Sequence, residues 1–250
     1  MSGGAARGFA HIGVIKAFEE SGITIDYVAG SSMGAVVGAF YAAGRTPDEM
    51  LQIAMKLNGG RLKPLLPFHF RKYGLDYVEQ LLEENVVVRT FEELKKPLYV
   101  AVTNLQSGKN EIVSSGKLYP AVKASAAIPF RFKEQRIDDV IYVDGGLTNN
   151  LPANALREQC TVVVGVSVNP IDGYIGNKLG LKQKIRRLAG IVFAEFEARN
   201  IALCDYHLEI AGLEKYGFEE YHAALAIHDL GYHAAKTFLA EHPELVTAHR

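Results

Sequence analysis

The residue pattern in this sequence best suited to nucleophilic chemistry is a serine between two glycines. The pentapeptide Gly30-Ser31-Ser32-Met33-Gly34 has the form G-x-S-x-G, with Ser32 at its centre. Residues 23–29 before it have strand character, and the apolar residues 35–43 after it can form a buried helix. A strand, a sharp turn and a helix would expose the Ser32 hydroxyl at the edge of a sheet, ready for attack. The alternative is an ordinary turn, because short glycine and serine patterns recur by chance.

A second candidate is the glycine-rich segment Gly3-Gly4-Ala5-Ala6-Arg7-Gly8, which opens a helical pattern over residues 7–21. Such a turn leaves backbone N–H groups unpaired and directed at one point, which suits a phosphate or an oxyanion. No Gly-Lys-Ser or Gly-Lys-Thr follows, so the segment does not fit a P-loop. A flexible N-terminal tail is the alternative interpretation.

The third candidate is Asp144, in Asp144-Gly145-Gly146 directly after the strand-like residues 140–143. Ligand sites in open α/β sheets lie at the carboxyl ends of strands, so we expect Ser32 and Asp144 to meet at one edge. A plain Asp-Gly turn is the alternative. None of the eight histidines follows a strand among small residues, and Ser32 comes too early for the usual α/β-hydrolase order. The residues therefore do not predict a Ser-His-Asp triad.

The elements that would position these groups alternate between strands and helices, which predicts a three-layer αβα fold with a mostly parallel central sheet. Thr46 is expected to cap a helix that has Pro47 in its first turn. The other expected strands are 97–103, 110–114, 140–143, 161–168 and 206–210, and the other expected helices are 75–84, 118–127, 181–200 and 219–241. We find no internal repeat and expect one domain over residues 1–250.

Composition narrows the functional classes. The chain has 250 residues and a formal net charge of -1, so no global field attracts nucleic acid. Cys160 and Cys204 lie far apart and favour free thiols in a reducing compartment. The N-terminus shows no signal-peptide pattern, and no apolar stretch is long enough to span a membrane. These features predict a cytoplasmic protein. The oligomeric state stays open.

The sequence resembles the patatin-like phospholipase family in three motifs taken together. They are the early turn at Ser32 between a strand and a helix (the elbow), the glycine-rich segment before it and the late Asp-Gly-Gly. Further stretches are similar to family motifs: residues 7–15 to the first helix, 121–129 to the segment ahead of the aspartate, and 142–152 to the aspartate motif. The resemblance implies a fold of the patatin and FabD-lysophospholipase type. It extends over most of the chain, and the motifs are specific as a combination.

The resemblance implies a Ser-Asp dyad without a catalytic histidine. Ser32 would attack a carboxylic ester, and Asp144 would take its proton and later activate water to release the acyl group. Backbone N–H groups of Gly3, Gly4 and Ala5 would hold the oxyanion. The supporting motif residues would be Arg7, Gly8, Gly30, Gly34, Gly145 and Gly146. Because an ordinary aspartate is a weak base near neutral pH, this mechanism needs Asp144 to be buried or tightly bonded to Ser32.

The implied substrates are phospholipids, lysophospholipids or related lipid esters, with no cofactor and no metal. Two alternatives are an acyltransferase of related fold and a catalytically weak lipid-binding protein. Contact with a membrane surface is suggested by the basic and apolar residues 61–73 and by the cations Lys182, Lys184, Arg186 and Arg187. A core connector and a solvated helix face are the alternatives for these two segments.

The sequence departs from the family at two places. Ala5 stands where the family often has a third glycine, and we expect it to be tolerated if its φ stays negative. The apolar strand that precedes the oxyanion segment in the family is not present ahead of Met1. We therefore expect the natural polypeptide to begin upstream.

Overall fold

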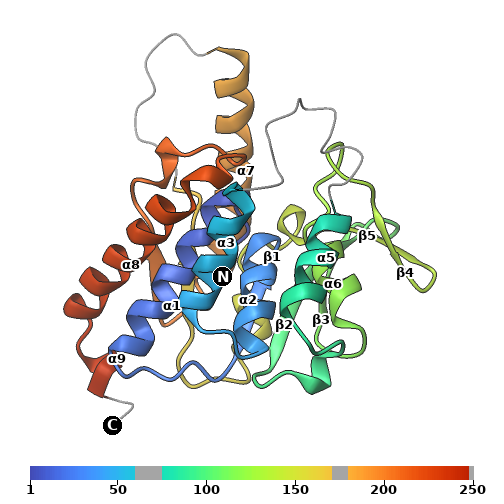
Figure 1. Ribbon diagram of the computed structural model, residues 1–250. Helices are drawn as coiled ribbons and strands as arrows, with labels where there is room; N and C mark the ends of the chain where they lie inside the picture. Colours follow the sequence, from blue (N-terminus) through green and yellow to red (C-terminus); the bar gives the residue numbers. More distant parts are fainter. Residues whose placement is uncertain (60–74, 171–179, 248–250) are drawn as a thin grey trace.

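The computed structural model describes residues 1–59, 75–170 and 180–247 (Figure 1). The described strands are β1 Val28–Ser31, β2 Leu98–Asn104, β3 Lys109–Val113, β4 Gln135–Ile137, β5 Val140–Asp144, β6 Val164–Ser167 and β7 Tyr206–Glu209. The described α-helices are α1 Ala10–Glu20, α2 Met33–Ala42, α3 Pro47–Gly59, α5 Asp76–Asn85, α6 Leu118–Ser125, α7 Leu181–Ile201, α8 Ala224–Glu241 and α9 Glu244–Thr247. Short 3₁₀ helices are η1 Ala5–Phe9, η2 Phe91–Glu93, η3 Gly145–Leu147, η4 Ala153–Ala155, η5 Leu213–Lys215 and η6 Tyr221–Ala223.

The strands form a five-stranded sheet and a two-stranded sheet. In the first, β1 runs parallel to β2, β3 and β5 run antiparallel to β2, and β4 runs antiparallel to β5. In the second, β6 and β7 are parallel. The prediction of a mostly parallel sheet is therefore wrong, since three of the five ladders between described strands are antiparallel. Short turns join β2 to β3 and β4 to β5, and such turns connect antiparallel neighbours only.

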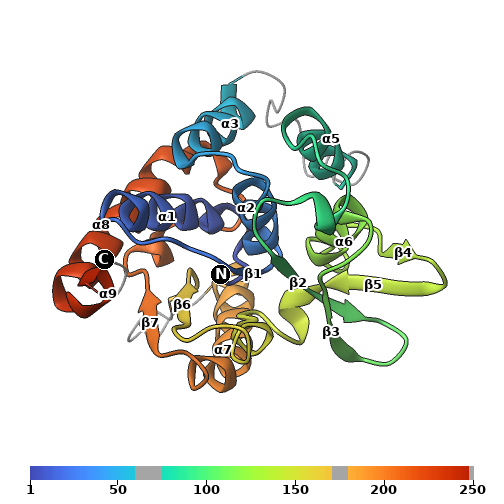
Figure 2. The same cartoon turned by 90° about the horizontal axis from the view of Figure 1, so that it is seen from below.

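Helices cover both sides of the strands. In Figure 2, α1, α2, α6 and α8 lie on one side and α7 lies on the other. This arrangement agrees with the expected three-layer αβα architecture. The backbone of Met1 and Ser2 links the two sheets, because Met1 O accepts from Ser31 N–H at 3.3 Å and Ser2 N–H donates to Val166 O at 3.0 Å.

Helices α1 and α8 approach each other closely through two glycines. A Cβ on Gly13 of α1 would lie 2.1 Å from His228 O, and one on Gly231 of α8 would lie 2.1 Å from Ala10 O. Glycine at both positions lets the two backbones touch, which packs the C-terminal helix against the first helix.

Several element boundaries differ from the predictions for local reasons. β1 begins at Val28 and not at residue 23, because its partner β2 begins at Leu98, directly after Pro97, which has no N–H to donate to a ladder. The strand β4 was not predicted. The cap of α3 is confirmed: Glu49 N–H donates to Thr46 Oγ1 at 3.3 Å, and Thr46 N–H donates to Glu49 Oε2 at 2.9 Å.

Candidate active site

Ser32 occupies a strained turn between β1 and α2. Its backbone has φ 51° and ψ −122°, a conformation that costs a non-glycine residue about 1–3 kcal/mol and is found at functional turns. A Cβ on Gly30 would lie 2.3 Å from Gly34 O, and one on Gly34 would lie 2.7 Å from Ser2 O. Both glycines of the motif are therefore required by the tightness of the turn.

Asp144 meets the Ser32 hydroxyl at the end of β5. The ladder pairs Asp144 with Val102 of β2, and β2 also pairs with β1, so the two strand ends come together. Ser32 Oγ donates to Asp144 Oδ2 at 2.7 Å, and Gly146 N–H donates to Asp144 Oδ1 at 2.8 Å. The structure thus joins two groups that the sequence placed 112 residues apart.

The Asp144 carboxyl group has an altered proton affinity. Burial raises the pKa of Asp144 from 3.8 to about 6, while the hydrogen bonds from Ser32 and Gly146 oppose that rise. A carboxylate with such a pKa is a stronger base than an exposed aspartate, yet it is still ionised near neutral pH. The following glycine is also constrained, because a Cβ on Gly145 would lie 2.1 Å from Ala101 O.

The glycine-rich N-terminal segment lies against this pair, since a Cβ on Gly3 would come within 2.9 Å of the Ser32 Cβ. Gly3 N–H, however, donates to Asn150 O at 3.2 Å, so the expectation that this group faces an oxyanion is wrong. Within the described residues, no hydrogen bond uses the N–H groups of Gly4 and Ala5. These two donors are the ones left for a ligand oxygen.

Ala5 adopts a φ of 47°, in the left-handed region that favours glycine. The condition set for tolerating Ala5, a negative φ, is therefore not met. The turn that orients the N-terminal segment demands a conformation in which the Ala5 methyl group is strained.

Arg7 and Gly8 support the segment from behind. The Arg7 guanidinium is buried, donates through Nε to Tyr216 O at 2.8 Å and lies 4.8 Å from the centre of the Phe218 ring. A Cβ on Gly8 would lie 2.3 Å from Met33 Cγ, so glycine lets η1 pack against the start of α2. Arg7 thus anchors the segment to the chain ahead of α8.

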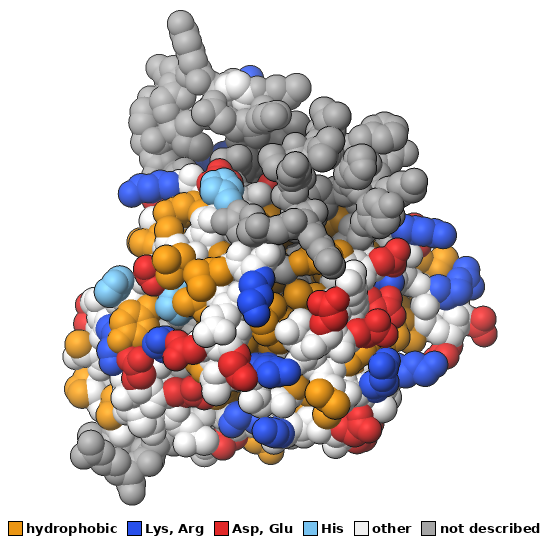
Figure 3. All heavy atoms as spheres, viewed as in Figure 1, with side chains coloured by type: hydrophobic (Ala, Val, Ile, Leu, Met, Phe, Trp, Pro, Cys, Tyr) orange, Lys and Arg blue, Asp and Glu red, His pale blue; other side chains and the backbone are white. Residues whose placement is uncertain are grey.

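An apolar groove leads away from Ser32 between α2, α3 and α5. It has a volume of about 110 Å³. On α2 its lining follows one helical face, at Met33, Val36, Val37 and Phe40. Figure 3 shows hydrophobic side chains in the middle of the face that carries α3 and α5. The groove has the chemistry of a site for a hydrocarbon chain.

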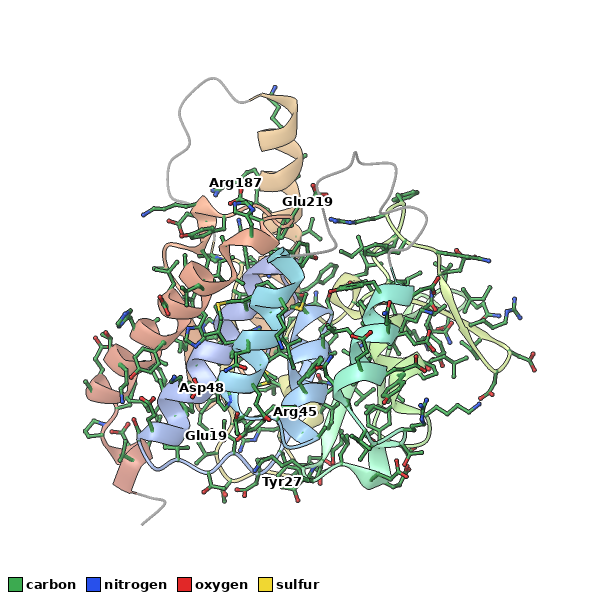
Figure 4. The ribbon with its side chains drawn as sticks, in the orientation of Figure 1. Glu19, Tyr27, Arg45, Asp48, Arg187 and Glu219 are labelled. Carbon is green, nitrogen blue, oxygen red and sulfur yellow. The ribbon has the colours of Figure 1, made fainter. Side chains whose placement is uncertain are left out.

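Two loops meet beside this groove. Phe132 and Tyr221 both line it, and they come from segments far apart in the sequence. Arg131 and Glu219, each close to one of these side chains, form an ion pair at 3.0 Å. Glu219 is labelled in the upper part of Figure 4, near Arg187 of α7. The ion pair ties together the loops that supply the two aromatic rings.

No histidine in the described parts of the chain forms a hydrogen bond with Ser32 or Asp144. His11 is buried under the N-terminal segment, where its Nε2 lies 2.8 Å from Ser2 O. Burial lowers the pKa of His11 to about 3, so its ring is neutral near neutral pH. His69 lies outside the described residues.

Some candidates from the sequence lie outside the described part of the structure. They are residues 61–73 and the side chains of Lys182 and Arg186. Lys184 is exposed and Arg187 is half-buried. Cys160 and Cys204 are free thiols.

Among residues 1–59, 75–170 and 180–247, no group of three or more His, Cys, Asp or Glu side chains is placed to hold a metal ion. None of the helices described is both long and apolar enough to cross a membrane.

Three residues at or behind the site were missed by the sequence analysis. Ser125 Oγ accepts from Ser32 N–H at 2.8 Å and donates to Ala101 O at 2.7 Å, so it bridges the elbow and β2. Asn150 contacts Gly3, and both Ser125 and Asn150 fall in stretches that already resembled family motifs. No feature of the sequence singles out Glu197, a buried carboxyl group on α7, because an acidic residue in a helix with many charges is ordinary.

The amino-acid sequence is similar to those of several known proteins. The family model described as patatin-like phospholipase matches residues 1–157. An uncharacterized NTE family protein of Mycobacterium tuberculosis is 36% identical over 173 residues, which cover 68% of this chain and 48% of that protein. Patatin-like phospholipase domain-containing protein 6 of Mus musculus is 29% identical over 181 residues, which cover 69% of this chain and 13% of that protein.

A solved structure agrees at the level of the fold. The crystal structure of VipD from Legionella pneumophila aligns with 99% of this chain and 66% of its own chain, with a TM-score of 0.54 and 16% identity. At that identity the likeness concerns the fold alone. The chain spans about half the length of the Mycobacterium tuberculosis relative described above.

Proposed function

Because this chain belongs to the patatin-like phospholipase family, we propose that it hydrolyses acyl esters of lipids, with Ser32 as nucleophile and Asp144 as base. The observation that carries the proposal is the 2.7 Å hydrogen bond from a strained serine to a buried carboxylate at the end of an apolar groove. The substrates proposed are phospholipids, lysophospholipids or similar esters, whose acyl chain the groove would hold.

The reaction would proceed in two halves. Ser32 Oγ attacks the ester carbonyl carbon while its proton passes to Asp144 Oδ2, and the leaving alcohol then takes that proton as the C–O bond breaks. Asp144 next removes a proton from water, which attacks the carbonyl carbon of the acyl-Ser32 ester. As the bond between that carbon and Ser32 Oγ breaks, Asp144 returns the proton to Ser32 Oγ and the fatty acid is released. Gly146 N–H holds the other oxygen of Asp144 at 2.8 Å throughout, which keeps Oδ2 directed at Ser32.

Negative charge on the carbonyl oxygen would be stabilised by two groups. The N–H groups of Gly4 and Ala5 are the proposed oxyanion donors, and each such donor is typically worth about 3 kcal/mol in the transition state. The N-terminus of α2, which starts at Met33, adds the positive end of a helix dipole at the same place.

Labelling with a fluorophosphonate probe tests the nucleophile. We expect the wild-type protein and Ser31→Ala to react, and Ser32→Ala to be inert. Ser31 is a matched control, because its Oγ is buried and has no hydrogen-bond partner among the described residues. Asp144→Asn should react at least 100-fold more slowly. Equal labelling of the wild type and Ser32→Ala would refute the assignment.

Product analysis separates hydrolysis from the alternatives. With an ester substrate in water and glycerol, we expect free fatty acid as the main product. Transfer of most acyl groups to glycerol would indicate an acyltransferase. A protein that binds lipid but neither labels nor releases fatty acid would contradict the proposed function.

We also propose that the groove mouth contacts a lipid surface. Phe130 is 106% exposed and has a φ of 65°, a strained conformation for an aromatic residue. Its neighbours Ile128 and Phe132 line the groove, so the exposed ring lies beside the substrate site. An aromatic ring held in water at such a place suits insertion between lipid head groups.

Co-sedimentation with vesicles tests this contact. Phe130→Ser should reduce binding to vesicles of anionic phospholipid by about tenfold. This is the loss of affinity expected when one large apolar side chain no longer inserts into the lipid. Val87→Ser is the matched control, because Val87 is 87% exposed and does not line the groove. Equal binding of both variants and the wild type would contradict the proposal.

A further inference from the structure

Glu197 is a buried carboxyl group that the proposed chemistry does not use. It lies on α7, beyond the residues that match the family model, and only 4% of it is exposed. None of the ion pairs between described residues includes it. A buried carboxylate without an ion pair needs hydrogen-bond donors, so its partners indicate what it does.

The groups around it are the side chains of Asn150, Ser167 and Asn169. Asn150 Nδ2 and Ser167 Oγ donate to the two Glu197 oxygens, and Asn169 lies close enough to favour the ionised form of the carboxyl group. Burial raises the pKa of Glu197, and these hydrogen bonds oppose the rise. Farther along α7, Asn200 Nδ2 donates to Asn149 Oδ1 at 3.0 Å. The helix is thus docked on the Asn149-Asn150 pair at two points.

The same donors hold the backbone of Gly3. Asn169 Nδ2 donates to Gly3 O at 2.6 Å, and Asn150 Nδ2 lies 3.5 Å from the same oxygen. An amide nitrogen carries two hydrogens, so Asn150 can bridge Glu197 and Gly3 O, while Asn169 lies between the two groups and donates to Gly3 O. Asn150 O also accepts the Gly3 N–H. Glu197 therefore holds the groups that fix both backbone polar atoms of Gly3.

The consequence follows from the planar peptide bond. Gly3 C=O and Gly4 N–H belong to one trans peptide unit and point in opposite directions. With Gly3 O held by the asparagines, Gly4 N–H faces the other way, and Ser32 lies next to this segment, 2.9 Å from the position of a Cβ on Gly3. Since residues 3 and 4 are both glycine, this peptide has little intrinsic preference against rotation. Its orientation has to come from outside contacts.

We propose that Glu197 is a positioning residue for the oxyanion site: through Asn150 and Asn169 it holds the Gly3-Gly4 peptide with its N–H toward Ser32. The inference rests on the proposed function, because it concerns the donor that stabilises the negative oxygen. Glu197 forms no hydrogen bond with Ser32 or Asp144. Its effect on the reaction therefore passes through the asparagines to the Gly3-Gly4 peptide.

The test compares Glu197→Gln and Asn169→Ala with Glu195→Gln, an exposed carboxyl on the same helix. A glutamine at position 197 removes the negative charge and keeps only one acceptor oxygen, so the hydrogen bonds that hold Asn150 and Ser167 become weaker. We expect kcat to fall about 100-fold in both network variants, the effect of losing one oxyanion donor, with KM changed less than about threefold. Glu195→Gln should match the wild type.

A second readout separates positioning from general damage. A trifluoromethyl ketone that adds to Ser32 forms an oxyanion, whereas an alkyl ether of equal length only fills the groove. In the variants, affinity for the ketone should fall in parallel with kcat, and affinity for the ether should stay unchanged. Asn169→Ala leaves the Glu197 side chain intact, so it provides the measurement if Glu197→Gln does not fold.

Two results would overturn the inference. One is folded variants that keep the wild-type kcat. The other is an equal loss of affinity for ketone and ether. A wild-type protein without esterase activity or probe labelling would overturn the proposed function, and this inference with it, so the two failures are distinguishable.

Discussion

At the scale of single residues, two opposing effects set the pKa of Asp144: burial raises it, and the hydrogen bonds from Ser32 and Gly146 lower it. Burial dominates and raises the pKa to about 6. The carboxylate must be free of a proton to act as a base, so activity should depend on pH through this group. That dependence distinguishes Asp144 from an ordinary exposed aspartate, which would be ionised over the whole working range.

We expect kcat/KM for an ester to rise through an apparent pKa near 6 and to fall about tenfold per pH unit below it. Because the folded-state pKa lies above the unfolded value of 3.8, ionised Asp144 destabilises the fold as pH rises through 6. Asp144→Asn should therefore gain stability relative to the wild type between pH 4 and pH 7. Thermal unfolding and rates across this range check both effects. A flat rate profile from pH 5 to 8 would contradict them.

Ala5 is a second residue whose backbone conformation makes a prediction. At φ 47° its methyl group is strained, and glycine is favoured there. Ala5→Gly should raise the free energy of unfolding by about 1 kcal/mol. The relief of backbone strain stabilises the folded state, and the greater freedom of glycine in the unfolded chain offsets part of that gain. Ala6→Gly is the control: Ala6 is buried and has no positive φ, so it should lose stability. Urea unfolding of both variants measures the difference, and a loss of stability in Ala5→Gly would refute the argument.

At the scale of elements, α2 sets the length of the groove. Its lining runs from Met33 to Phe40, and seven residues of helix rise about 10 Å, the length of an extended chain of about eight carbons. Rates for esters of increasing acyl length should therefore climb to about eight carbons and then level off. A series with acyl chains from four to sixteen carbons measures this.

Phe40→Leu should move that plateau to longer chains, because it shortens the side chain farthest along the α2 face from Ser32. Phe18→Leu is the matched control, since Phe18 is equally buried but does not line the groove. Both variants should lose about 1 kcal/mol of stability. If the chain-length plateau moved in both variants, or in neither, the idea that the α2 face ending at Phe40 sets the length of the groove would be wrong.

The elements also show how far the sequence could be taken. The elbow, the strand before Asp144 and the cap at Thr46 were predictable, because glycine, apolar runs and capping residues act locally. The strand β4 was not, because Gln135 and Arg136 lack an alternating apolar pattern and its turn uses Asp138 with a φ of 52°. The antiparallel pairing of β5 with β2 was not predicted either, because these two strands are far apart in the sequence and no short turn joins them.

At the scale of the whole molecule, the site is assembled from distant parts of the chain. Ser32 and Asp144 could be predicted because their motifs are contiguous in sequence. The use of Gly3 N–H by Asn150, and the link from Gly3 to Glu197, could not, since they depend on how α7 docks. The N-terminal segment is also held by the C-terminal part of the chain, through Arg7 Nε and Tyr216 O. The geometry of the proposed site therefore depends on helices outside the motifs.

The contact of α1 with α8 makes this dependence measurable. A Cβ on Gly231 would lie 2.1 Å from Ala10 O, which is backbone and cannot turn aside, so Gly231→Ala must push α8 away from α1. We expect a loss of about 2–3 kcal/mol in the free energy of unfolding. Activity should fall at temperatures where the protein is still folded, because η1 and the Gly4 and Ala5 donors directly precede α1.

Gly190→Ala on α7 is the matched control, since no described atom lies within 4 Å of a Cβ there. In that open helical position alanine should raise stability by about 0.5–1 kcal/mol, as alanine is the better helix former. The two glycine-to-alanine changes thus have opposite expected signs, and thermal and urea unfolding would compare them directly. If Gly231→Ala proved as stable as Gly190→Ala, the close approach of α1 and α8 would not be what holds the C-terminal helix in place.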